Sequence, residues 1–175
     1  TGCAPAFVDF VERDEGGRAV LTYAWVPGAP WRRGVGDVAR LLHTVHRHQV
    51  PRAMRRLPAT PGGALASADA MLTAAPQHRS RELRAVRPAP SSQLASSRPA
   101  TLSIVHTDCG PGNVLRGRLG VVLIDWQCPG AGDPVEDLAC FRSPAMMILY
   151  GQRPHSVATT RRFLGEYAAL DDAAA

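Results

Sequence analysis

The chain contains no lysine, and all twenty of its basic residues are arginine. No lysine ammonium group can therefore serve in any site built from these 175 residues. The sequence also lacks an apolar run near the ~20 residues that a membrane-spanning helix needs. The sequence does not begin with a basic stretch followed by an apolar one, as a secretory signal does. These absences predict a cytoplasmic globular protein with no membrane partner.

Closely spaced metal-ligand pairs are also missing. The four cysteines form no CxxC pair: Cys3, Cys109, Cys128 and Cys140. Free thiols are therefore favoured over a disulfide framework, and over a zinc site that would include His106. His43, His46 and His48 lie close together but without a carboxylate at useful spacing. We interpret them as ordinary surface or half-buried histidines and not as metal ligands.

The positive charge is unevenly distributed and has few aromatic neighbours. Residues 1–100 hold 14 arginines and 7 acidic residues, whereas residues 101–175 hold 6 arginines and 8 acidic residues. A net charge of +5 is compatible with a nucleic-acid partner. The excess lies, however, in a Pro/Ala/Ser-rich middle without the interleaved aromatics that stack on bases. A solvated arginine-rich surface is the favoured interpretation, with no nucleic-acid partner.

The first part of the chain predicts a hairpin followed by a helix. Residues 5–12 alternate apolar and polar side chains, which is typical of a half-buried strand, and residues 19–26 form a second β-rich run. Residues 13–17 supply the turn, and Pro27-Gly28 ends the hairpin. A helix opening at Asp37 then has one apolar stripe: Val38, Leu41, Leu42 and Val45.

The remainder predicts short helices and two strands. Helical stretches are expected at residues 66–75 and 79–86, and a Pro/Ser-rich loop at 87–100. Residues 101–105 predict a strand, and the apolar run 121–124 predicts a buried one, with loops after each. Asp133, Pro134 and Glu136 have the spacing of a helix start with a capping box. Ser156 is expected to cap a last helix with one apolar face: Phe163, Leu164 and Tyr167.

Three oxygen-bearing side chains have the spacing of a phosphate-handling site. Asp108 follows the first of these strands, Asn113 lies five residues later, and Asp125 ends the second strand. Asn113 and Asp125 offer hard oxygen ligands, which suit Mg²⁺ bound together with phosphate oxygens. Asp108 is then free to accept a proton from a hydroxyl nucleophile. Phosphoryl transfer needs both a bound metal ion that neutralises phosphate charge and a base that orients the nucleophile.

These motifs resemble the aminoglycoside phosphotransferase/choline kinase family. His106-Thr107-Asp108…Asn113 is similar to the catalytic loop of protein-kinase-like phosphotransferases, and Ile124-Asp125-Trp126 to their metal-binding motif. The segment 132–139 is similar to the segment that follows this metal-binding motif in the family. The resemblance implies ATP and Mg²⁺ as cofactors, Asp108 as catalytic base, and Asn113 and Asp125 as metal ligands.

The same resemblance implies supporting residues and a hinge. His106 and Asp137 would brace the catalytic loop, and Asp133 would cap the helix that carries Asp137. The segment 23–28 is similar to the hinge between the two lobes of the family, so adenine would lie against backbone groups of Ala24 and Val26. The implied fold is α+β and protein-kinase-like. Residues 1–28 would be a partial small β lobe with the hinge, and 29–175 a mainly helical catalytic lobe.

The chain also departs from the family pattern. The family's small lobe begins with a phosphate-covering loop, a strand lysine and a helix glutamate, whereas this chain starts at what resembles the fourth strand. We therefore expect an N-terminally truncated kinase for a small hydroxylated molecule, with little activity alone. Similar proteins use aminoglycosides, choline, thiamine, homoserine and sugars, and the sequence does not choose among them. The alternative is a non-catalytic, pseudokinase-like remnant or binding module.

Overall fold

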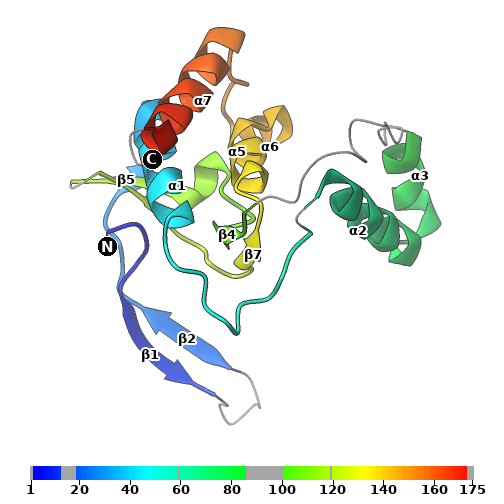
Figure 1. The fold of residues 1–175 in the computed structure, drawn as a ribbon, viewed down its shortest axis with the longest axis horizontal. Helices are drawn as coiled ribbons and strands as arrows, with labels where there is room; N and C mark the ends of the chain where they lie inside the picture. Colours follow the sequence, from blue (N-terminus) through cyan, green and yellow to red (C-terminus); the bar gives the residue numbers. More distant parts are fainter. Residues whose placement is uncertain (1, 13–18, 59, 86–100, 119, 173–175) are drawn as a thin grey trace.

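A computed structural model describes residues 2–12, 19–58, 60–85, 101–118 and 120–172. Helices and short antiparallel sheets make up an α+β architecture (Figure 1). None of the helices in these ranges combines the length and apolar character that crossing a membrane requires. The expected turn at 13–17 and the loop at 87–100 lie outside the described residues.

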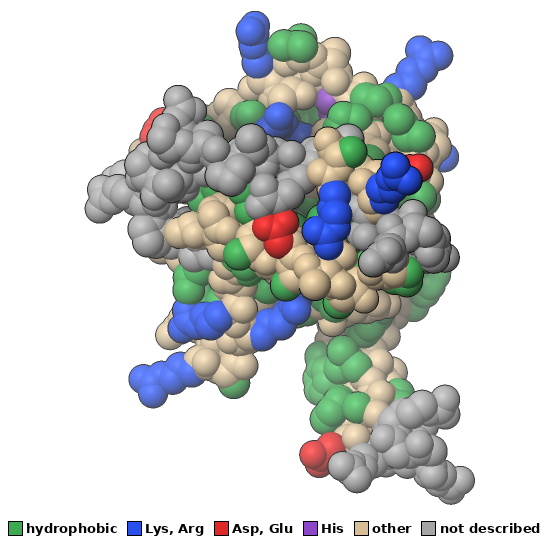
Figure 2. All heavy atoms as spheres, turned by 90° about the vertical axis from the view of Figure 1, so that its right-hand side faces the viewer, with side chains coloured by type: hydrophobic (Ala, Val, Ile, Leu, Met, Phe, Trp, Pro, Cys, Tyr) green, Lys and Arg blue, Asp and Glu red, His purple; other side chains and the backbone are tan. Residues whose placement is uncertain are grey.

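The N-terminal part is an antiparallel hairpin of β1 (Phe7–Val11) and β2 (Val20–Tyr23). Figure 1 shows it projecting away from the helices, and in Figure 2 hydrophobic side chains gather over this projection. The expected hairpin is confirmed, but the half-buried pattern is wrong, because all residues of both strands are exposed. Alternation buries one face only where a second layer covers the sheet, and no described element covers this one.

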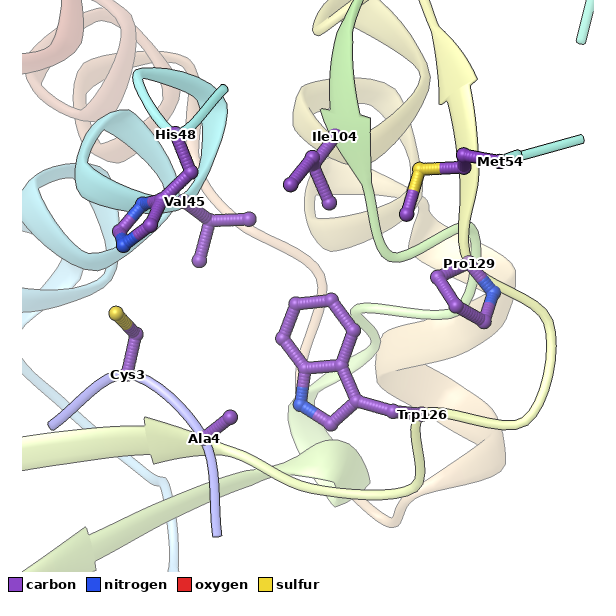
Figure 3. Close-up of a pocket in the computed structure, with 8 residues that line it drawn as sticks. All are labelled: Cys3, Ala4, Val45, His48, Met54, Ile104, Trp126 and Pro129. Atoms are coloured by element: carbon purple, nitrogen blue, oxygen red, sulfur yellow. The ribbon is translucent and has the colours of Figure 1, made fainter. Parts of the chain in front are cut away.

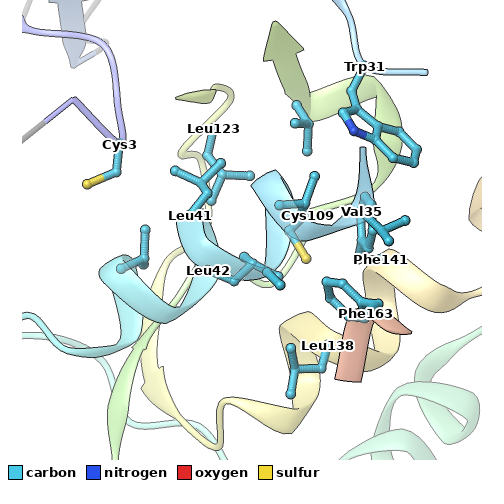
Figure 4. Packing of buried hydrophobic residues seen from close by; sticks show 14 of the residues in the cluster. Cys3, Trp31, Val35, Leu41, Leu42, Cys109, Leu123, Leu138, Phe141 and Phe163 are labelled. Carbon is cyan, nitrogen blue, oxygen red and sulfur yellow. The ribbon is translucent and has the colours of Figure 1, made fainter. Parts of the chain in front are cut away.

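The core forms around α1 (Val35–His46), which packs against α7 (Val157–Asp172). The apolar stripe from Val38 to Val45 is buried as expected, and it meets Phe141 and Phe163 in one cluster (Figure 4). The helix begins two residues earlier than expected. Asp37 lies in its first turn and pairs with Arg40 and Arg116. Both hydrogen bonds lower the pKa of Asp37, that from Arg116 more than that from Arg40, whereas burial opposes them.

The helices α2 (Pro61–Ala74) and α3 (Gln77–Ala85) lie to one side of the core (Figure 1). Both start earlier than the expected stretches. For α2 the reason is that Thr60 caps the helix by accepting a hydrogen bond from Gly63 N at 3.1 Å, with Pro61 in the first turn. No residue of α2 is buried. Helix α2 therefore contributes little to the core.

Two small sheets frame the loops of interest. One has the order β3-β5-β6, formed by Ala29–Pro30, Val114–Gly117 and Gly120–Leu123. The other pairs β4 (Ser103–Val105) with β7 (Gly130–Gly132). The run expected to be fully buried is only partly so, since β6 lies at a sheet edge. The strand β7 was expected as loop, because a Gly-Ala-Gly stretch carries no strand signal of its own.

Two short helices complete the fold between β7 and α7. They are α5 (Val135–Arg142) and α6 (Pro144–Leu149), and a 3₁₀ turn, η1 (Pro111–Asn113), precedes β5. Asp133 Oδ1 accepts a hydrogen bond from Val135 N at 2.9 Å at the start of α5. The expected capping box is incomplete, since Glu136 makes no return hydrogen bond to residue 133 among the described residues. The start of α7 follows expectation, with Thr159 N donating to Ser156 Oγ.

Candidate active site

The loop after β4 is held by one buried carboxylate. Asp137, on α5, is fully buried, and its Oδ2 and Oδ1 accept hydrogen bonds of 2.8 Å from the backbone N–H groups of His106 and Thr107. Thr107 adopts a left-handed φ of 71°, which is uncommon for a residue other than glycine. Charge-assisted hydrogen bonds stabilise this conformation. Asp137 thus determines the path of the chain into Asp108.

Asp108 and Asn113 contact each other across the loop. Asn113 Nδ2 donates to the backbone oxygen of Asp108 at 2.8 Å and to its Oδ2 at 3.1 Å. Asn113 is buried, whereas Asp108 is exposed. The Asn113 amide therefore orients the Asp108 carboxylate, which remains accessible to solvent.

The end of β6 brings Asp125 beside this pair. Ile124 N donates to Asn113 O at 2.9 Å, so these two residues lie opposite each other just beyond the paired ends of β5 and β6, and Asp125 follows directly. Asp125 has a left-handed φ of 64° and is half-buried. Among the described residues its carboxylate makes no side-chain hydrogen bond.

His106 joins the two loops. Its Nδ1 lies 3.3 Å from the donating Asp108 N–H, and its Nε2 lies 2.9 Å from Ile124 O. Because Nδ1 accepts an N–H, Nε2 carries the proton and donates to the carbonyl. The ring also packs edge-on against Trp126, with centroids 4.6 Å apart. This neutral imidazole connects the chain entering Asp108 with the chain entering Asp125.

Tyr150 is a neighbour of the site that no sequence motif indicated. Burial raises its pKa, and the negative charges of Asp108 and Asp125 raise it further. The phenol group is therefore within electrostatic range of both carboxylates. The ring packs so closely on the loop that a Cβ at Gly112 would lie 1.9 Å from Tyr150 Cε1. Residue 112 can only be glycine while Tyr150 stays in place.

One of the three clustered histidines has a carboxylate partner after all. His46 is buried, and its Nε2 lies 3.1 Å from Asp137 Oδ2, while its Nδ1 lies 2.7 Å from Tyr167 Oη. The expectation of no carboxylate partner is wrong for His46, because Asp137 lies 91 residues away along the chain. Short-range spacing cannot reveal such a contact.

The cysteines in the described residues are free thiols, as expected. Cys109 Sγ donates to Asp137 O at 2.9 Å. Its hydrogen bond with the Cys140 thiol, followed by burial, raises the pKa of Cys109 well above its usual range. The same contact lowers the pKa of Cys140. These thiols pack the loop against α5, and no zinc-type cluster occurs within the described ranges.

The hinge residues line a separate cavity. Ala24 and Val26 border a hollow of about 650 Å³ together with Gly2, residues 4–6 and described residues of β5, β6 and their connection. Ala24 N donates to Ala6 O at 2.7 Å. In the described chain, neither the Ala24 carbonyl nor the Val26 N–H has a backbone partner. None of Asp108, Asn113 and Asp125 lines this cavity.

A smaller apolar cavity of about 270 Å³ lies beside Trp126 (Figure 3). Trp126 directly follows Asp125 and extends toward Ile104 and Ala4. Met54 and Val45 close the sides of the cavity. Trp126 Nε1 donates to Leu123 O at 3.0 Å, which sets the turn that carries Asp125. The lining includes one titratable imidazole, His48, and no carboxylate or guanidinium group, and none of Asp108, Asn113 and Asp125 contributes to it.

Comparison with protein families matches residues 4–173 to the phosphotransferase enzyme family. The chain belongs to this family. The comparison with curated protein sequences gave no significant match. Many solved structures share the fold, and three of them illustrate the similarity. The chain is 24% identical to an aminoglycoside-3'-phosphotransferase of type VIII, with a TM-score of 0.56 over 98% of this chain and 68% of that one.

The other two structures are more distant in sequence. A choline/ethanolamine kinase family protein from Mesorhizobium loti is 18% identical, with a TM-score of 0.53 over 98% of this chain and 63% of that one. The ADP-bound aminoglycoside phosphotransferase APH(2'')-Ib is 14% identical, with a TM-score of 0.57 over 95% of this chain and 60% of that one. The expected α+β, kinase-like phosphotransferase fold is confirmed. The chain spans about two thirds of the length of these structures.

Proposed function

We propose that the chain carries the catalytic lobe of an ATP-dependent kinase that transfers the γ-phosphate to a hydroxyl group of a small molecule. The observation that carries this proposal is the contact between Asp108 and Asn113 beside the strand end that bears Asp125. Catalysis of phosphoryl transfer consists mainly of positioning and electrostatic stabilisation. A carboxylate and an amide held by a buried hydrogen-bond network meet that requirement.

In this proposal Asp108 accepts the proton of the attacking hydroxyl. Its exposure lets a substrate approach, and Asn113 Nδ2 fixes one carboxylate oxygen. Asp137 and His106 set the loop in place as supporting residues, and Asp133 caps the helix on which Asp137 lies. The Ala24 carbonyl and the Val26 N–H, which have no backbone partner, are proposed to hydrogen-bond the adenine edge.

Asn113 and Asp125 suit Mg²⁺, which is the metal that the family resemblance implies. Because Asn113 uses its nitrogen on Asp108, its Oδ1 remains available, and the Asp125 carboxylate makes no side-chain hydrogen bond among the described residues. Magnesium usually takes one or two carboxylates and completes its shell with phosphate oxygens and water. When bound, the ion would neutralise charge on the phosphates. The division into residues 1–28 and 29–175 remains part of this proposal.

A non-catalytic binding module is the alternative, and the absence of lysine favours it. Single-turnover transfer from radiolabelled ATP in the presence of Mg²⁺, by a longer polypeptide in which a glycine-rich strand and a lysine precede residue 1, distinguishes the two. The substrates are a panel of aminoglycosides, choline and sugars. A kinase transfers label to one of them, and Asp108→Asn slows the transfer by a factor on the order of a hundred or more. Nucleotide binding without transfer would support the module, and equal rates in both proteins would contradict the role of Asp108.

A further inference from the structure

A second polar pocket lies between the segment before α1 and the start of α7. Its volume is about 360 Å³, which is within the usual range for small-ligand sites. Four arginines line it: Arg32, Arg33, Arg153 and Arg162. None of its lining residues is acidic, and none belongs to the set of Asp108, Asn113 and Asp125.

The charge of this pocket is poorly balanced by the protein. Arg162 Nε pairs with Glu166 at 2.8 Å, but Arg32, Arg33 and Arg153 make no ion pair in the part of the chain that the structure describes. Clustered guanidinium groups repel one another, and a bound anion relieves that repulsion. The start of α7 adds positive potential, since Ser156 and Thr159 of its first turn also line the pocket.

The floor of the pocket is an ordered structure. Gln152 Nε2 donates to Trp31 O at 2.7 Å and so joins the two walls. The Trp31 ring packs on His155 and on Phe141, with centroids 6.0 and 5.0 Å apart. His155 Nε2 is buried with no hydrogen-bond partner among the described residues. Because this nitrogen is itself shielded from solvent, recognition of a ligand in the pocket rests on the arginines and on the start of α7.

We infer that this arginine pocket binds a small phosphate-bearing molecule at a site separate from the catalytic loop. Guanidinium groups bind phosphate oxygens in a bidentate manner, and the N-terminus of a long helix favours the same charge. The inference does not depend on the proposed kinase activity. It concerns only the anion that this pocket recognises.

Pyrophosphate without added Mg²⁺ is the probe, and its affinity for the whole chain is measured by calorimetry. We expect binding that weakens with added NaCl, and that weakens about tenfold in Arg33→Gln or Arg153→Gln. Arg161→Gln is the matched control, because Arg161 lies on α7 but does not line the pocket. It should leave the affinity unchanged.

Asp125→Asn separates this site from the catalytic loop. Pyrophosphate affinity in this variant should equal that of the unmodified chain, because the pocket shares no residue with that loop. Binding that requires Mg²⁺ and is lost in Asp125→Asn would place the phosphate at the loop and overturn the inference. An equal loss in Arg153→Gln and Arg161→Gln, or no binding at millimolar pyrophosphate, would also overturn it.

Discussion

At the scale of single residues, Asp137 is the group on which the site depends most. Its carboxylate accepts hydrogen bonds from two loop amides and contacts a third partner, His46, in a fully buried position. A buried charged acceptor that serves several donors cannot be replaced by an amide without leaving a donor unpaired. Exposed Asp108 is constrained by this buried residue, although the two side chains have different roles.

We expect Asp137→Asn to lower the free energy of unfolding by about 2–3 kcal/mol, because one loop N–H or His46 loses its acceptor. Urea unfolding followed by circular dichroism measures the change. Asp133→Asn is the matched control, since asparagine is also a good helix cap, and the expected change is below about 0.5 kcal/mol. Equal effects in both variants would contradict the bracing role of Asp137.

Gly112→Ala should destabilise the chain, because the new methyl group would lie 1.9 Å from Tyr150 Cε1. A double-mutant cycle provides the test. In a Tyr150→Ala background the same substitution should cost much less, giving a coupling energy of about 1–3 kcal/mol. Gly165→Ala, where nothing lies within 4 Å of the added Cβ, is the control. Additive effects of Gly112→Ala and Tyr150→Ala would show that the ring does not pack on the loop.

His155 predicts a pH dependence of stability. Burial, and then the charge of Arg142, lower its pKa in the folded chain. As the pH falls from 7 toward 5, the unfolded state takes up this proton more readily than the folded state. Unfolding therefore becomes easier at lower pH. In His155→Gln the free energy of unfolding should fall less over this range, as measured by urea titrations at each pH. A steeper fall in the variant would mean that the folded state favours the charged form.

At the scale of elements, α1 and α2 make different contributions despite similar lengths. Leu42 in α1 is fully buried, whereas Met71 in α2 is 66% exposed. Helices gain most of their stability in proteins by packing an apolar face, so α1 should matter far more.

Leu42→Ala should therefore lower the free energy of unfolding by about 2–5 kcal/mol through loss of packing and a residual cavity. Met71→Ala should change it by less than about 0.5 kcal/mol. Thermal and urea unfolding of both variants give the comparison. A large effect of Met71→Ala would indicate that α2 packs on a surface which the described residues do not include.

At the scale of the whole molecule, the main question is how phosphates are held without lysine. Charged groups aimed at the transferring phosphate contribute more to rate than to binding, and the loss of one preorganised donor can slow a reaction about a hundredfold. We expect the 175-residue chain to bind ADP with Mg²⁺ but to turn ATP over very slowly.

A longer polypeptide with a glycine-rich strand and a lysine joined before residue 1 should raise this rate by a factor on the order of a hundred or more. Steady-state ATP consumption by both forms measures the difference. In the longer form, Asp108→Asn should remove the gain. Fast turnover by the 175-residue chain alone would show that an arginine or a second chain performs the function of the lysine.

The sequence by itself determined the β1–β2 hairpin and the apolar stripe of α1, and it indicated the kinase-like fold through resemblance, whereas the roles of the candidate site residues stay a prediction. Asp108 and Asp125 follow short apolar runs, Asn113 lies in the loop between them, and the α1 stripe has strict helical spacing, so local pattern was enough to indicate these residues. Local pattern could not show β7, because Gly130 and Gly132 form a strand through pairing with β4 and close packing on Leu57. It also could not show that the β1–β2 hairpin lies exposed, since burial depends on what covers a sheet.

Only the tertiary structure decided which distant residues meet. His46, Tyr167 and Asp137 come from three helices, and Tyr150, directly after a fourth, reaches the loop that carries Asp108. The arginine pocket likewise assembles from Arg32, Arg33 and residues more than a hundred positions later. Such contacts form when helices pack against one another in the folded chain. The order of the helices along the sequence does not show which of them will pack together. The candidate reactive residues can therefore be recognised from short sequence motifs, whereas the residues that support and surround them are decided by tertiary packing.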